Sequence, residues 1–138
     1  MEPILNPYLN FDGNTAEAMK HYHSVLGGEL NMQTFAEAKM PGDPKEMDRI
    51  VHASLKSEGL TLMASDTRLG SPPKFGDNIH LSLGGQDEDR LTKAFNGLAK
   101  DGKVDMPLAK QFWGDTFGML TDKFGVHWMV NITAPPQK

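Results

Sequence analysis

The sequence contains no cysteine among its 138 residues. This absence excludes disulfide bonds, thiolate metal sites and a cysteine nucleophile, and it agrees with a reducing compartment. No stretch approaches the roughly 20 apolar residues of a membrane-spanning helix. Residues 1–7 have no basic region followed by a long apolar run, so no signal peptide is expected. We therefore expect a cytoplasmic protein with no membrane partner.

The sequence also has only a small excess of charge of one sign. The chain has 14 Lys and Arg residues and 18 Asp and Glu residues, interspersed along its length, for a formal net charge of −4. Proteins that bind nucleic acid usually concentrate Lys and Arg on one face, and no such cluster is present. A glycine-rich strand–turn–helix fingerprint for a nucleotide-type cofactor is missing too. The expected partners are a small molecule and a second copy of the chain.

Hydrophobic residues make up 38% of the chain, enough for a packed core in one domain of this length. Apolar patterns separated by Gly and Pro predict a strand, a helix and three further strands in the first half. These elements are expected at residues 7–11, 14–26, 30–35, 50–55 and 60–65. Asn14 is expected to cap the helix, with Glu17 completing a capping box.

The same succession returns after a linker at residues 70–76 that is rich in Gly, Ser and Pro. The second set of elements is expected at residues 78–83, 87–100, near 104, 116–121 and 126–132. Tyr22 corresponds to Phe95 at an offset of 73 residues, and Gly28 corresponds to Gly102 at an offset of 74. Each half is therefore a β-α-β-β-β unit.

Two such units are expected to pair around a shared interior, because half of a sheet cannot cover its own concave face. The predicted fold is α+β: two paired βαβββ modules that form a cupped mixed sheet with the helices on its outer face. The modules span about residues 1–68 and 77–134 of a single domain, residues 1–138.

Within the strands, apolar residues alternate with polar ones. If the helices cover the apolar face, the opposite face is polar and bears three histidines. Any one such residue most often faces solvent on an open sheet. The whole set is more typical of a ligand cleft, because strands that face only water usually carry Lys, Glu and Thr. The candidate cleft residues are Asn6, Tyr8, His52, Met63, Asn78, His80, Trp113, His127 and Met129.

Aromatic side chains at Tyr8, Phe75, Phe112 and Trp113 could enclose a flat or apolar ligand. For Phe112 and Trp113, a contact between two copies of the chain or an anchor for the loop explains the pattern equally well.

Several short segments, spread along nearly the whole chain, match the sequence pattern of a known protein family. They are NPYLNFDGN at 6–14, AMKHY at 18–22, LGGEL at 26–30, LMASD at 62–66, FW at 112–113, FG at 117–118 and TDKFGVHWMVN at 121–131. With these segments the sequence resembles the PhnB-like branch of the glyoxalase/bleomycin-resistance superfamily, also called vicinal oxygen chelate proteins. The resemblance implies paired βαβββ modules, each wrapping a cup, and a homodimer.

Metal-dependent members of that superfamily place one His, Glu or Gln ligand on the first and last strand of each module. By this resemblance the four positions fall near Asn6, Met63, Asn78 and Met129. Zinc, nickel and iron need imidazole or carboxylate donors, so no divalent metal and no cofactor is expected there. A rearranged site on His52, His80 and His127 is the alternative.

Two classes of function stay open, and whether the protein is an enzyme is not decided. The first is a metal-free protein that binds or sequesters a small molecule, as the drug-resistance relatives do. The second is a metal-dependent lyase, isomerase or dioxygenase that uses the rearranged histidine site. The metal content of the purified protein separates the two.

Overall fold

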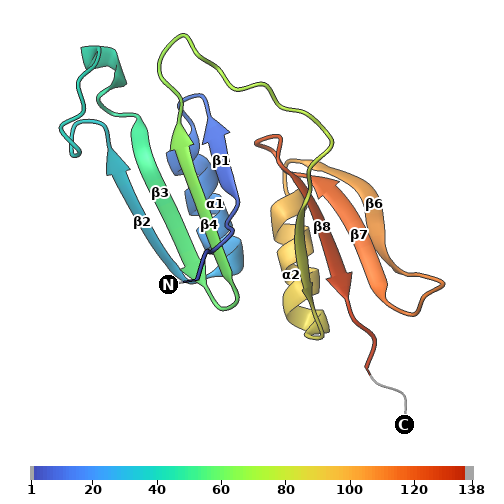
Figure 1. Ribbon diagram of the computed structural model, residues 1–138. Coiled ribbons are helices and arrows are strands. Elements are labelled where there is room, and N and C mark those ends of the chain that lie inside the picture. Colours follow the sequence, from blue (N-terminus) through green and yellow to red (C-terminus); the bar gives the residue numbers. More distant parts are fainter. Residues whose placement is uncertain (1, 136–138) are drawn as a thin grey trace. The chain divides into compact units, whose positions relative to one another are not determined.

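The computed structural model describes residues 2–135. The chain divides into two compact units, Met1–Lys74 and Phe75–Lys138, whose boundary falls inside the predicted linker (Figure 1). The first unit contains β1 (Tyr8–Phe11), α1 (Thr15–Leu26), β2 (Glu29–Thr34), the short 3-10 helix η1 (Pro44–Glu46), β3 (Ile50–Ser57) and β4 (Leu60–Asp66). The second contains β5 (Leu81–Gly85), α2 (Glu88–Ala99), β6 (Lys103–Lys110), β7 (Thr116–Thr121) and β8 (His127–Ile132).

Each unit builds its own four-stranded mixed sheet. The strand order is β1-β4-β3-β2 in the first sheet and β5-β8-β7-β6 in the second. In both sheets the first strand runs parallel to the last, and the other neighbours are antiparallel. The identical strand order confirms the predicted α+β fold of two βαβββ modules.

One helix covers one face of each sheet (Figure 1). In the first unit, Tyr22 of α1 is 0% exposed, and α1 packs against β3, whose Ala53 and Leu55 are also fully buried. In the second unit, Phe95 of α2 is 4% exposed over a sheet whose Trp128 is 3% exposed. Tyr22 and Phe95, matched by their offset in the sequence, therefore take the same place in their modules. Burial of one such side chain contributes about 1.5–3 kcal/mol to the free energy of folding.

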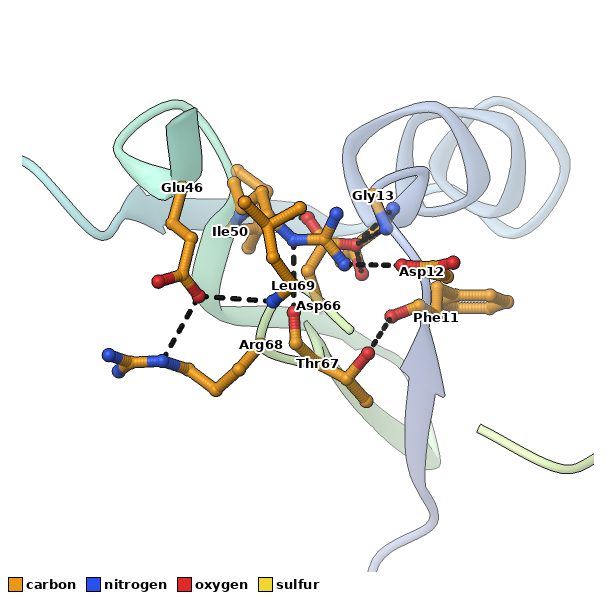
Figure 2. Close-up of polar contacts among 11 residues, drawn as sticks. Phe11, Asp12, Gly13, Glu46, Ile50, Asp66, Thr67, Arg68 and Leu69 are labelled. Carbon is orange, nitrogen blue, oxygen red and sulfur yellow. Dashed lines mark hydrogen bonds and ion pairs between the residues drawn. The ribbon is translucent and has the colours of Figure 1, made fainter. Parts of the chain in front are cut away.

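The start of α1 differs from the prediction. Asn14 precedes the helix but its side chain makes no capping hydrogen bond. Instead Asp66, at the end of β4, accepts hydrogen bonds from the Gly13 N–H at 2.9 Å and the Thr15 N–H at 3.0 Å (Figure 2). A carboxylate is a stronger acceptor for these amide groups than the neutral Asn14 side chain. The cap is thus supplied by a residue 51 positions away.

A second carboxylate holds the loop between β2 and β3. Glu46 is 6% exposed, and its two oxygens accept hydrogen bonds from the Asp43 N–H at 3.1 Å and the Leu69 N–H at 3.1 Å. It also forms an ion pair with Arg68 at 3.1 Å (Figure 2). These contacts tie η1 to the segment that follows β4.

Two strands of the second sheet depart from their predicted bounds. β5 was expected at residues 78–83 and lies at Leu81–Gly85, because Gly84 and Gly85 pair with Asn131 and Ile132 of β8. Ile79, inside the strand predicted at residues 78–83, precedes β5 and is 72% exposed. β6 is longer than the short strand expected near residue 104, and two register shifts interrupt its pairing with β7.

Gly28 and Gly102, which correspond in the two halves, lie where the backbone of a neighbouring strand leaves no room for a side chain. A Cβ atom at Gly28 would overlap the Lys56 carbonyl oxygen of β3, and one at Gly102 would overlap the Thr121 carbonyl oxygen of β7. The two positions therefore serve the same purpose in their modules, as their offset in the sequence predicted.

Across residues 2–135, none of the helices has the length and apolar character needed to cross a membrane.

Candidate functional site

The open face of each sheet, opposite its helix, is where the candidate residues gather. In the first sheet, the register places Tyr8 of β1 beside Met63 of β4, Met63 beside Ser54 of β3, and Ser54 beside Asn31 of β2. These side chains form one row across four strands, since residues directly opposite lie on the same face. The alternating partners Ala53, Leu55, Leu62 and Ala64 are buried, which confirms the assignment of the faces.

Tyr8 and His52 are in contact on this face. The Tyr8 hydroxyl lies 3.3 Å from Nδ1 of His52, and the ring centroids are 5.9 Å apart. Tyr8 is 44% exposed, so the pair is open to solvent. A phenol beside an imidazole can donate to or accept from a polar group on a ligand.

On the open face of the second sheet, the polarity of the side chains changes along the strand direction. The middle row contains Ser82, Met129, Met119 and Met106 on the four strands β5, β8, β7 and β6. Toward one end of the sheet, Thr121 of β7 pairs with His127 of β8. The face therefore passes from a polar end to a row of thioethers.

A hollow of about 560 Å³ opens at the polar end. Its lining residues are Asp77, His80, Asp101, Gly102, Lys103, Asp105, Met119, Thr121, Asp122, Lys123 and His127. His80 and His127 are neighbours in it, with ring centroids 5.3 Å apart. Two of the three candidate histidines thus converge, while His52 belongs to the other unit.

His127 is held by a chain of hydrogen bonds. The Thr121 hydroxyl donates to Asp105 at 2.7 Å, because a carboxylate only accepts. Thr121 has one hydroxyl hydrogen, so its oxygen accepts from Nδ1 of His127 at 2.9 Å. On the other side of the ring, Nε2 lies 3.1 Å from the Gly76 carbonyl oxygen, which also only accepts. Each ring nitrogen of His127 therefore lies within hydrogen-bond distance of an oxygen acceptor.

An aromatic cluster lies on the other side of the thioether row, away from Thr121 and His127 along the strands. Phe112 and Trp113 meet edge to face with ring centroids 4.9 Å apart, and Trp113 meets Phe117 of β7 at 6.1 Å. Phe117 is two residues before Met119 on the strand, so both belong to the open face. Phe112 is 96% exposed and Trp113 is 50% exposed.

Asn6 and Asn78, the candidates expected at the first-strand positions of the two modules, lie outside the strands. Asn6 precedes β1 and Asn78 precedes β5, so neither is paired in a sheet. The register sets Tyr8 beside Met63 and Ser82 beside Met129, which moves the first-strand positions of both modules toward the C-terminus.

Sequence reasoning missed four residues of the second open face: Met106, Met119, Thr121 and Asp105. Met119 and Thr121 follow the same alternation as Phe117 and could have been found from it. Asp105 and Met106 could not, because the register shift between Val104 and Met106 interrupts the alternation.

The superfamily's divalent metal site does not fit the residues present. The paired positions carry a phenol, a hydroxyl and two thioethers: Tyr8, Ser82, Met63 and Met129. None of these is the imidazole or carboxylate donor that zinc, nickel or iron prefers. Within the described part of the chain, no group of three or more His, Asp or Glu side chains is placed to hold a metal ion.

Similar proteins agree with this architecture. The chain is 33% identical to protein YjdN of Escherichia coli strain K12 over 93% of its own length and 94% of that protein. The crystal structure of protein PA1353 from Pseudomonas aeruginosa is 40% identical, with a TM-score of 0.87 over 97% of this chain and all of that one. A Bacillus cereus structure described as a PhnB protein and putative 3-demethylubiquinone-9 3-methyltransferase is 25% identical, with a TM-score of 0.77 over 95% of this chain and all of that one.

Residues 4–130 match the family model of the Glyoxalase/Bleomycin resistance protein/Dioxygenase superfamily. The match covers both βαβββ modules, from the residues before β1 into β8. The chain belongs to this superfamily, within which it is similar to the PhnB-like proteins.

Proposed function

We propose that the protein binds a small, largely apolar molecule on the open faces of its sheets without a divalent metal ion. The observation that carries this proposal is the row of side chains at the paired strand positions, where Met63 lies beside Tyr8 and Met129 beside Ser82. Thioether side chains are flexible and polarizable, so they adapt to apolar and aromatic ligands. The exposed ring of Trp113 at the end of the second face extends the same apolar surface.

The alternative is a metal-dependent lyase, isomerase or dioxygenase with a metal ion on His52, His80 and His127. The arrangement of His127 argues against it. Its Nδ1 lies 2.9 Å from the Thr121 hydroxyl oxygen and its Nε2 lies 3.1 Å from the Gly76 carbonyl oxygen, so each nitrogen is already taken up by a contact within the protein. A metal ion on either nitrogen would have to replace one of these two contacts.

The methyltransferase named for the B. cereus structure finds no support in this chain. The connection from β1 to α1 is Asp12-Gly13-Asn14, which is not the glycine-rich turn that holds a nucleotide-type cofactor. Its N–H groups are also engaged, because Gly13 and Thr15 donate to Asp66.

A polarity-sensitive neutral dye, Nile red, tests ligand binding directly. We expect the folded protein to enhance dye fluorescence, and Met129→Glu or Met63→Glu to weaken that enhancement by placing a charge on an open face. Met40→Glu is the matched control, because Met40 is 38% exposed in the loop outside both open faces. Equal dye binding by all three variants, or none by the wild type, would overturn the proposal.

We also propose that the protein is a homodimer. Large apolar side chains are exposed in the chain by itself, among them Leu5 at 98%, Ile79 at 72% and Phe112 at 96%. Exposed apolar residues and open strand edges are commonly covered by a partner. Sedimentation at micromolar concentration should give twice the chain mass of 15.2 kDa, and a monomer would contradict this proposal.

A further inference from the structure

The three methionines of the second open face stand in one lateral row. Met106 of β6 is the direct partner of Met119 of β7, and Met119 is the direct partner of Met129 of β8. Directly opposite residues have Cβ atoms about 5 Å apart. Methionine has three rotatable bonds beyond its Cα atom, so the two outer sulfur atoms can reach a common point above the central one.

A β-bulge brings Met106 into this row. Val104 pairs with Leu120, and the next pair is Met106 with Met119, so two residues of β6 stand against one of β7. Asp105, the extra residue, is hydrogen-bonded to Thr121 on the open face. Without the extra residue, the alternation of side chains would carry Met106 to the face that α2 covers. Bulges of this kind re-aim side chains, which is why they recur beside functional sites.

The surroundings of the row favour a small cation. Met119 lines the hollow at the polar end, so the row can be reached from solvent. Four aspartates and two lysines line that hollow, which leaves an excess of negative charge beside the thioethers. Met106 itself is 40% exposed.

Thioether sulfur is a soft, uncharged donor. It binds soft monovalent ions such as Cu(I), whereas zinc, nickel and iron prefer imidazole and carboxylate ligands. From the row, the bulge and the accessible hollow together, we propose that Met106, Met119 and Met129 form a binding site for a soft monovalent metal ion, Cu(I) or its analogue Ag(I). This site goes beyond the proposed ligand-binding function and does not depend on it.

Ag(I) is the suitable probe because it needs no reducing agent. The wild-type protein would be titrated with silver nitrate in chloride-free buffer while the methionine methyl signals are followed by NMR. We expect the signals of Met106, Met119 and Met129 to shift together and to saturate at one equivalent, while the Met40 signal stays in place. Zn(II) should leave all of these signals unchanged.

Leucine substitutions remove the sulfur donors at nearly constant volume. Each of Met106→Leu, Met119→Leu and Met129→Leu should weaken Ag(I) binding by about tenfold or more, because even the loss of a hydrogen-bond partner behind a metal ligand costs about 10–100-fold in metal affinity. The triple variant should lose it. Met40→Leu, a change at a comparably exposed methionine, should bind as the wild type does. Circular dichroism would confirm that every variant is folded.

Three results would overturn the proposal. The first is a folded triple variant that binds Ag(I) as tightly as the wild type, since the histidines of the hollow would then be the ligands. The second is a wild-type titration in which the three signals do not move. The third is an equal response to Zn(II), because a site that accepts zinc is not a thioether site.

Discussion

Asp66 accepts two hydrogen bonds from Thr15, one from the backbone N–H at 3.0 Å and one from the side-chain hydroxyl at 2.7 Å. The same carboxylate accepts from Gly13 N–H at 2.9 Å and from Ile50 N–H at 2.8 Å (Figure 2). Asp66 is 5% exposed. The end of β4, the start of β3 and the first turn of α1 therefore share one buried carboxylate, whose negative charge also suits the N-terminus of a helix.

Replacing Asp66 with Asn should destabilise the first unit. An amide group has one acceptor oxygen, and its NH₂ group would face the Ile50 N–H, which the second carboxylate oxygen now accepts. We expect a loss of about 1.5–3 kcal/mol in the free energy of unfolding, the range for hydrogen bonds to a charged group. Urea denaturation measures it.

The control is Asp12→Asn. Asp12 is 53% exposed and its contact is the ion pair with Arg49 at 2.7 Å. A surface ion pair contributes about 0–1 kcal/mol. An Asp66→Asn variant no less stable than Asp12→Asn would show that the buried carboxylate does not join these elements.

Gly118 allows α2 and β6 to approach β7 closely. A Cβ atom at this position would lie 2.9 Å from a ring carbon of Phe95 and 3.0 Å from the backbone of β6 at Leu108 N. Gly118→Ala should therefore overpack the core of the second unit and cost about 1–3 kcal/mol of stability. Thermal and urea unfolding would measure the loss.

Gly84→Ala is the matched control for this change, because Gly84 is also a strand glycine. The nearest atom to a Cβ there is the Asn131 carbonyl oxygen at 3.8 Å, an ordinary contact distance. A Gly118→Ala protein with wild-type stability would mean that Phe95 and β6 can move apart without cost.

The stability of the first unit should depend on Glu46 in acid. The Leu69 N–H bond holds the pKa of the Glu46 carboxyl below its usual value of 4.5, and the Asp43 N–H bond and Arg68 act in the same direction against partial burial. A carboxyl with a lowered pKa in the folded state stabilises that state above the unfolded pKa, and this contribution is lost as the pH falls through the folded pKa.

Glu46→Gln should therefore be less stable than the wild type at neutral pH, and the difference should shrink as the pH falls below about 4.5. Since the Leu69 N–H is the largest cause of the shift, Arg68→Met should keep most of this pH dependence. Urea denaturation from pH 7 to pH 3 follows both variants. A constant difference between Glu46→Gln and the wild type across this range would contradict the expectation.

The parts of the fold that followed from the sequence are those with one buried face. β4 and β8 alternate between buried and half-buried residues along almost their whole length, because each lies in the middle of its sheet under a helix. This burial imposes a period of two on the sequence. Met63 and Met129, which alternate with the buried residues, were therefore assigned to the correct face.

The sequence predicted the structure incorrectly where backbone pairing or a residue distant in the chain determines it. Gly84 and Gly85 carry no side chain to reveal their pairing with β8, so β5 was placed too early. Asn14 has the right chemistry for a helix cap, but Asp66 takes that role from the far end of the module. The bulge at Asp105 shifts β6 out of a regular alternation, so Met106 could not be assigned to the open face.

The protein should contain no bound divalent metal ion and should lack glyoxalase activity. The paired positions Tyr8, Met63, Ser82 and Met129 offer no charged or imidazole donor, and His127 is engaged through both nitrogens. Elemental analysis after purification without an affinity-tag metal should find zinc, nickel, manganese and iron far below one equivalent. His52→Ala, His80→Ala and His127→Ala should leave that result unchanged. Near-stoichiometric metal in the wild type, lost in any of these variants, would establish the rearranged histidine site instead.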